Sequence, residues 1–154
     1  MQLSTPICFE DAFPDLNRRF VRAGAELLIN LTNDSWSETL SAETQHLVAA
    51  RFRSVENGRP LLRATNGGIT VGFDRYGRVL PESVLPPFEA ATTRVTLRLP
   101  LDPITTPYTR YGEYLPLTLI ITLLFLLGRH AASSGRQKQS RNNLLRTTLI
   151  DSDL

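Results

Sequence analysis

The sequence of 154 residues has one cysteine, one lysine and two histidines. A single cysteine, Cys8, excludes an intramolecular disulfide, and His46 and His130 are too far apart in sequence to suggest a zinc cluster. No metal and no cofactor are expected. The net charge of +2 reflects basic residues that gather from Arg129 onward, and no basic face interleaved with aromatic side chains indicates nucleic acid. No positive region or long apolar core precedes Cys8, so no export signal is expected at this end.

Cys8 lies in the run Ile7-Cys8-Phe9-Glu10-Asp11, an apolar stretch that ends in two carboxylates near a predicted strand-to-helix turn. A strand end that faces a helix N-terminus gives a thiol partial exposure and a favourable charge environment, as a nucleophile requires. Free cysteine is also among the most buried residue types, so a structural Cys8 is the alternative. Glu10 and Asp11 likewise have an alternative role as caps of the following helix.

Hydrophobic periodicity predicts an α/β fold with a mixed sheet. A helix is predicted to begin at Pro14 and stop at Gly24, and a second one, capped by Thr39 or Ser41, to run to about Glu56. Strands are predicted over 3–9, 25–32, 61–65, 69–74 and 78–80, with an edge strand over 94–99. The segment Asn66-Gly67-Gly68 is expected to form a hairpin-type connection.

The apolar run Leu115–Leu127 suggests a membrane helix. Thirteen residues make a helix of about 20 Å, shorter than the ~30 Å hydrocarbon core, so a buried core helix is an alternative. Tyr108, Tyr111 and Tyr114 precede the run like an interfacial belt, and Arg129 follows it. These flanks favour a transmembrane helix followed by a cytoplasmic C-terminus.

Three separated blocks resemble the nitrilase superfamily of carbon-nitrogen hydrolases and, within it, the apolipoprotein N-acyltransferases of bacterial envelopes. The blocks are Ile7 to Asp11, Ala25 to Trp36, and Gln45-His46 together with Arg51 to Thr70. The resemblance extends from Pro6 to about Leu127. Two departures are visible: Ser37-Glu38 follow Trp36 where the family usually has Phe-Gly, and Leu40 to Thr44 lacks the usual Gly-Pro-aromatic pattern.

The resemblance implies an architecture and a location. Residues 1–107 would be the C-terminal half of a nitrilase-like four-layer αββα sandwich. Residues 108–128 would be an interfacial segment and a transmembrane helix, and 129–154 a basic, disordered tail. The domain would lie on the periplasmic side of a bacterial inner membrane, with the tail in the cytoplasm.

The resemblance also implies a Glu-Lys-Cys catalytic set and roles for five residues. Cys8 would be the nucleophile, and the N–H of Phe9 would be the oxyanion donor. Glu10 would be a carboxylate outside the first layer of the site that supports the nucleophile. Asn33 and Trp36 would shape the substrate pocket. The implied substrates are a phospholipid acyl donor and a diacylglyceryl lipoprotein acceptor.

The glutamate and lysine of the family lie upstream of its cysteine, whereas seven residues precede Cys8 and the one lysine is Lys138. We therefore expect an upstream polypeptide to supply them, and no activity from this chain alone. One alternative is a soluble carbon-nitrogen hydrolase (amidase), which requires Leu115–Leu127 to be core. Another is a truncated fragment without catalysis.

Other conspicuous residues have plain structural interpretations. Trp36 can be a packing residue. Gln45 and His46 are predicted to be helix scaffold, because no second histidine or carboxylate is evidently placed to make a metal site or a triad with them. The charges of Glu56, Arg59 and Arg63 are predicted to form structural or solvent-exposed pairs.

Overall fold

The computed structural model describes residues 1–97, 99 and 104–130. Met1–Gly112 forms one compact unit and Glu113–Leu154 a second. The first unit contains a four-stranded sheet in the order β1-β2-β3-β4, with the strands parallel except for the last pair. The strands are β1 (Leu3–Ser4), β2 (Leu27–Asn33), β3 (Leu61–Asn66) and β4 (Val71–Phe73). The expected α/β class with a mixed sheet is therefore confirmed.

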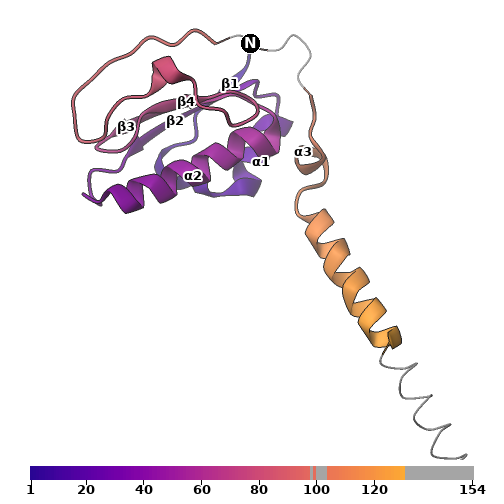
Figure 1. The fold of residues 1–154 in the computed structure, drawn as a ribbon. Helices are drawn as coiled ribbons and strands as arrows, with labels where there is room; N and C mark the ends of the chain where they lie inside the picture. Colours follow the sequence, from indigo (N-terminus) through magenta and orange to yellow (C-terminus); the bar gives the residue numbers. More distant parts are fainter. Residues whose placement is uncertain (98, 100–103, 131–154) are drawn as a thin grey trace, which may run out of the picture. The chain divides into compact units, whose positions relative to one another are not determined.

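Two helices, α1 (Pro14–Arg22) and α2 (Leu40–Asn57), lie on the same side of this sheet (Figure 1). Proline at the first position suits α1, because that position needs no N–H donor. The end of α2 follows from Gly58, which adopts φ of 61° and closes the helix in the left-handed conformation. Both helix positions agree with the sequence prediction. Three short helices complete the unit: η1 (Cys8–Ala12), η2 (Pro81–Ser83) and α3 (Pro107–Tyr111).

The core lies between the helices and the sheet. It consists of apolar side chains from α1, from the connection after it, from α2 and from the three longer strands, namely Val21, Ala25, Leu28, Ala50, Leu61, Val71 and Phe73. The partly buried Phe20 and Leu47 pack against it. Burial of these side chains is the main stabilising contribution to the unit.

The register of β2 and β3 determines what lies next to this core. Leu28 pairs with Leu61, Asn30 with Arg63, and Thr32 with Thr65. Because side chains alternate along a strand, these three pairs share one face of the sheet. That face begins as apolar core and becomes polar toward the carboxyl ends of the strands.

Three predicted strands differ from the structure. The strand expected over 3–9 shortens to β1 with a single bridge between Ile7 and Leu31, because the backbone turns into η1 at Cys8. Residues 78–80 contribute only a bridge from Val79 to Phe73. The edge strand over 94–99 is wrong for the residues described there, 94–97 and 99, which have no strand conformation. Alternating polarity suits an extended segment, but a strand also needs a hydrogen-bonded neighbour.

The apolar run Leu115–Leu127 lies in a helix over 114–130. Its large apolar side chains are 51% to 66% exposed. The transmembrane helix predicted over 108–128 is not supported. Among the residues described, no helix combines the length and the apolar character needed to cross a membrane. The tail from 131 to 154 lies outside the described residues.

Candidate active site around Cys8

The backbone at Cys8 is held in an unusual conformation. Cys8 has φ of 52°, in the left-handed region that residues other than glycine rarely adopt. The Glu10 carboxylate accepts a hydrogen bond from the N–H of Ile7 at 2.8 Å, and Asn30 Nδ2 donates to the carbonyl of Cys8 at 2.9 Å. The turn is thus fixed from η1 and from β2. Such strain is common where a side chain is presented for chemistry.

The side chain of Cys8 is a free thiol of intermediate burial. The pKa of its thiol is lowered from the ordinary value, chiefly by a hydrogen bond with the Thr32 side chain. The backbone N–H groups of Asn33 and Phe9 lower the pKa further, whereas burial and the charge of Asp34 oppose them. A lowered pKa increases the thiolate fraction, which is the nucleophilic form.

The structure brings four of the five predicted site residues together around this turn. The backbone N–H of Phe9 contributes to the lowered pKa of Cys8, and its half-exposed ring lies 5.1 Å from the His46 ring. Glu10 accepts the N–H of Ile7 and so forms the capping box of η1, while its role in support of the nucleophile stays a prediction. The side chain of Asn33 does not face the sulfur, because its Oδ1 accepts hydrogen bonds from Ser35 Oγ at 2.7 Å and Asn66 Nδ2 at 3.1 Å.

Trp36, the fifth, lies in the loop after β2 and is 74% exposed, so it is not a core packing residue. It lines a mainly apolar cavity of about 320 Å³ together with Phe9 and residues of α2. Ser37 holds this loop, because its Oγ can donate its one hydrogen to the carbonyl of Asp34 at 3.2 Å or to the buried carboxylate of Glu43. Ser37 and Glu43 stand where the sequence departs from the usual family pattern, and the structure pairs them.

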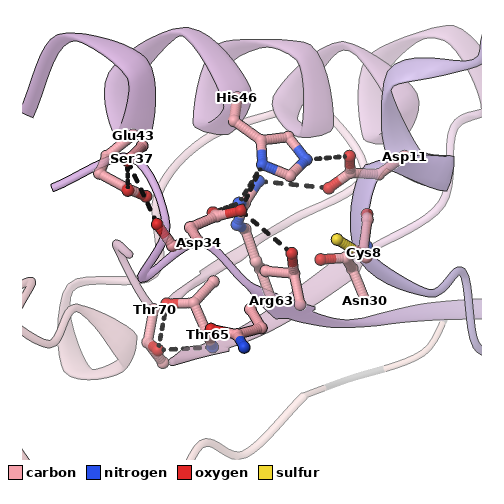
Figure 2. A network of polar contacts seen from close by, with 12 residues as sticks. Cys8, Asp11, Asn30, Asp34, Ser37, Glu43, His46, Arg63, Thr65 and Thr70 are labelled. Carbon is pink, nitrogen blue, oxygen red and sulfur yellow. Dashed lines mark hydrogen bonds and ion pairs between the residues drawn. The ribbon is translucent and has the colours of Figure 1, made fainter. Parts of the chain in front are cut away.

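A closed ring of buried charges lies beside the turn, and sequence reasoning missed it (Figure 2). His46 on α2 places Nε2 at 2.7 Å from Asp11 Oδ1 and Nδ1 at 2.9 Å from Asp34 Oδ1. From β3, Arg63 places Nη1 at 3.2 Å from Asp11 Oδ2 and Nη2 against Asp34 Oδ2. Each of the four residues is at most 7% exposed.

Two predictions are therefore corrected. His46 is not simple scaffold, because two carboxylates face it, and the Asp11 side chain pairs with His46 and Arg63 instead of capping the helix that follows. For Arg63 the structure decides between the two predicted alternatives, because its ion pairs are buried and structural. One sequence signal pointed this way: the alternation of β3 puts Arg63 on the same face as Leu61, and a buried arginine requires carboxylates.

The ring favours a protonated His46. Burial by itself lowers the pKa of the imidazole, and the charge of Arg63 acts in the same direction. The hydrogen bond to Asp11 and the charges of Asp11 and Asp34 outweigh both, so the pKa of His46 is raised above its ordinary value. Nη2 of Arg63 also lies 2.9 Å from Nδ1, which would suit a neutral ring that accepts there. Because both ring nitrogens face carboxylate oxygens, we favour the imidazolium, which can donate from both.

Among the described residues, no group of three or more histidine, cysteine, aspartate or glutamate side chains is placed to hold a metal ion. The charge of the ring is instead balanced within it, because Arg63 and a protonated His46 together neutralise Asp11 and Asp34. Its contacts join η1, α2, β3 and the loop after β2 around Cys8. Chemically, the arrangement can present a stabilised thiolate beside a backbone N–H donor.

Comparison with known proteins supports the resemblance seen in the sequence. An "Apolipoprotein N-acyltransferase 2" of Treponema denticola is 42% identical over 139 residues, which are 88% of this chain and 26% of that protein. An "Apolipoprotein N-acyltransferase" of Borreliella burgdorferi is 42% identical over 144 residues, 94% of this chain and 26% of that protein. The chain thus spans about a quarter of the length of these relatives.

A solved structure of a carbon-nitrogen hydrolase from Helicobacter pylori has a TM-score of 0.49 at 18% identity, and the match covers 58% of this chain and 38% of that one. The family model described as carbon-nitrogen hydrolase matches residues 1–101, which include every element from β1 to η2. The chain therefore belongs to the carbon-nitrogen hydrolase family.

Proposed function

We propose that this chain carries the nucleophile of an apolipoprotein N-acyltransferase. The observation that carries the proposal is the turn at Cys8, where the backbone has φ of 52° and is fixed by the hydrogen bonds of Glu10 and Asn30. The names of the relatives supply the reaction class. The proposed substrates are a phospholipid as acyl donor and the N-terminal amine of a diacylglyceryl lipoprotein as acceptor.

In the first step the Cys8 thiolate attacks the ester carbonyl of the phospholipid. The N–H of Phe9 stabilises the oxyanion that forms, and cleavage of the C–O bond releases a lysophospholipid, which takes up a proton. The acyl group remains on Cys8 as a thioester. In the second step the lipoprotein amine attacks the thioester, the C–S bond breaks, and the amine loses its proton to a general base as the thiolate is regenerated.

The other proposed site residues act around this centre. Glu10 holds the Cys8 turn by accepting the N–H of Ile7, and Asn33 fixes the loop beyond β2. Trp36 and the ring of Phe9 offer apolar surface for a lipid chain in the cavity that they line. A base and a second oxyanion donor, the glutamate and lysine that the resemblance implies, would come from an upstream polypeptide.

We also propose that the helix over 114–130 contacts lipid. Its apolar side chains are exposed, and burial of such surface in hydrocarbon is favourable. A lipid contact suits an enzyme whose two substrates both reside in a bilayer. The division into 1–107, 108–128 and 129–154 and the periplasmic position of the domain, with the tail in the cytoplasm, stay predictions. Extraction of membranes at alkaline pH tests the lipid contact, and release of the full-length chain into solution would contradict it.

The decisive experiment supplies the upstream part of a relative, such as the Treponema denticola protein, by co-expression with this chain. After incubation with phosphatidylethanolamine vesicles, intact-mass and peptide mass spectrometry should locate an acyl group on Cys8, and neither Cys8→Ala nor Cys8→Ser should carry it there. An acyl group elsewhere, with Cys8 free, would refute the assignment. This chain alone should not N-acylate a diacylglyceryl peptide, and turnover above the Cys8→Ala control would show that other residues supply the base and the oxyanion donor.

Amide hydrolysis is the second candidate, because the matched family is that of the carbon-nitrogen hydrolases. Water would then replace the lipoprotein amine in the second step. Ammonia release from short amides by the co-expressed pair, without acyl transfer to a diacylglyceryl peptide, would favour this alternative.

A further inference from the structure

Glu43 is a buried carboxylate with one free oxygen. It lies in the first turn of α2 and is 1% exposed. Its Oε1 is in hydrogen-bond contact with Ser37 Oγ, whereas its Oε2 has no hydrogen-bond partner among the described residues. A carboxylate oxygen that is shielded from water and lacks a donor is costly, so its presence calls for an explanation.

The chain leaves room for this oxygen at Gly68, in the connection between β3 and β4. A Cβ at Gly68 would overlap both Glu43 Oε2 and Asp34 Oδ2, so the two carboxylates gather over a residue without a side chain. His46 and Arg63 neutralise Asp34. No ion pair among the described residues includes Glu43, so its negative charge stays uncompensated.

Glu43 also lines the cavity of about 320 Å³ that Trp36 and Phe9 line. Ligand cavities commonly combine apolar walls with a few placed polar groups. Aromatic faces attract cations, and a carboxylate binds an ammonium group through charge-assisted hydrogen bonds. The combination suits a small cationic group attached to an apolar body better than a purely apolar ligand.

Two substrates of the acyl transfer described above can carry a primary ammonium, namely phosphatidylethanolamine and the lipoprotein N-terminus. The first also carries a phosphate next to its ammonium. Of the described residues that line the cavity, His46 alone can be positively charged, and it is already paired with two carboxylates of the ring. A phosphate would therefore meet Asp34 and Glu43 without a free cation. The lipoprotein N-terminus carries its amine and its lipid close together, and it fits the cavity better.

We propose that Glu43 binds the N-terminal ammonium of the lipoprotein acceptor, while Trp36 and Phe9 contact the adjoining lipid. The inference rests on the proposed function. Glu43 acts here as a binding residue. The ammonium keeps its proton while it is bound, and it gives that proton to the general base in the second step described above.

The fluorescence of Trp36, the only tryptophan, can report binding without any acyl transfer. The probes are hexylammonium and 1-hexanol, which share an alkyl chain and differ in charge. The full-length chain should bind hexylammonium more tightly than 1-hexanol. Glu43→Gln keeps the shape of the side chain and removes the charge, so it should weaken hexylammonium binding about tenfold and affect 1-hexanol little.

The matched control is Glu38→Gln. It removes the same charge from the loop that carries Trp36, but Glu38 is exposed and lines a different cavity. The control should bind both probes like the unaltered chain. Equal weakening by Glu38→Gln and Glu43→Gln would overturn the proposal. If Glu43→Gln does not fold, as judged by circular dichroism, the unaltered chain decides, because equal affinity for the two probes would overturn the proposal as well.

The co-expressed pair distinguishes the two sources of the ammonium. Glu43→Gln should raise the KM for a diacylglyceryl peptide about tenfold, with a smaller effect on kcat. Thioester formation should be slowed no more with phosphatidylethanolamine vesicles than with phosphatidylglycerol vesicles, whose headgroup has no ammonium. A slowing confined to phosphatidylethanolamine would assign Glu43 to the acyl donor and refute the proposal. A lower kcat at unchanged KM would indicate a structural role and refute it too.

Failure of this inference and failure of the proposed function are distinguishable. A chain whose affinity for hexylammonium depends on Glu43, in a pair that never carries an acyl group, would keep the ammonium site and lose the acyltransferase. A pair that transfers the acyl group to the peptide equally well with Glu43→Gln would keep the acyltransferase and remove Glu43 from it.

Discussion

The face of the sheet that α1 and α2 cover has two halves of different chemistry. At the pair Leu28 and Leu61 it is fully buried and apolar. One pair further along, at Asn30 and Arg63, it is equally buried but polar. The apolar half contributes stability by leaving water, whereas the polar half must recover the cost of desolvation through specific partners. The polar half lies at the carboxyl ends of the parallel strands, where α/β sheets commonly carry their sites.

The difference teaches that burial alone does not define the core of this unit. Leu28 can be replaced by another apolar side chain of similar volume at modest cost, because its contacts are not directional. Arg63 has no such substitute, since its two contacts to carboxylates depend on a planar, permanently charged group. Substitutions in the polar half, around Cys8, are thus limited by the geometry of ion pairs and hydrogen bonds, whereas substitutions in the apolar half are limited by side-chain volume.

The largest expected effect comes from breaking the polar half. Arg63→Met keeps much of the side-chain volume but leaves Asp11 and Asp34 buried without their arginine, so it should cost about 3–5 kcal/mol of unfolding free energy. Leu28→Ala in the apolar half should cost about 2–5 kcal/mol. Denaturant unfolding followed by circular dichroism measures both. The two variants should differ in alkylation of Cys8, which only Arg63→Met should change in the folded state.

A midpoint for Arg63→Met equal to that of the unaltered chain would show that the ring is not a stabilising ion-pair cluster. An altered Cys8 reactivity in folded Leu28→Ala would show that the two halves are not independent.

The second prediction concerns the pH dependence of the unfolding free energy, to which the apolar half should contribute nothing. The pKa of His46 is raised above the ordinary value of 6.5, so the imidazolium contributes stability that is fully present below that value. This contribution is lost as pH rises through the raised pKa of the folded state. The lowered pKa of Cys8 acts in the opposite sense, because its contribution grows as pH rises toward the ordinary value of 9.0. The contribution of His46 to the pH dependence must therefore be measured without that of Cys8.

Unfolding midpoints in a Cys8→Ser background, measured from about pH 5 to pH 8, isolate the histidine. Stability should fall with rising pH in this background, and His46→Gln should flatten the slope. A slope that survives His46→Gln unchanged would assign the pH dependence to other groups.

The sequence predicted the apolar half well and the polar half poorly. Pro14 and Gly58 mark helix boundaries through local backbone chemistry, and the pairing of β3 with β4 follows from apolar runs around Gly67. Such signals act within a few residues. The ring joins positions 11, 34, 46 and 63 from different elements, and no local pattern reports which of them meet.

Cys8 was predicted from its flanking residues, but two features of its surroundings were not. Its left-handed backbone depends on the contacts of Glu10 and Asn30 that close the turn, and the ring of charges beside it depends on residues far apart in sequence. The strand expected over 94–99 failed for the converse reason, since a correct local pattern found no hydrogen-bonded neighbour among the residues described. Periodicity thus identifies which side chains are buried, and tertiary pairing decides what they do.

The smallest expected effect lies at the edge of the polar half, in the loop that carries Trp36. Ser37→Ala removes the hydrogen bonds from Ser37 Oγ to Glu43 and to the Asp34 carbonyl, while the Ser37 N–H still bonds Asp34 at 3.1 Å. The loss should cost about 1–3 kcal/mol, because the buried Glu43 carboxylate loses a hydrogen-bond partner while the backbone contact keeps the loop in place. The loop should nevertheless move more freely. Trp36 is the only tryptophan in the chain, so its fluorescence reports on this loop. The steady-state anisotropy of that fluorescence should fall in Ser37→Ala and stay constant in the control Ser41→Ala. An unchanged anisotropy in Ser37→Ala would show that the contact with Glu43 does not hold this loop.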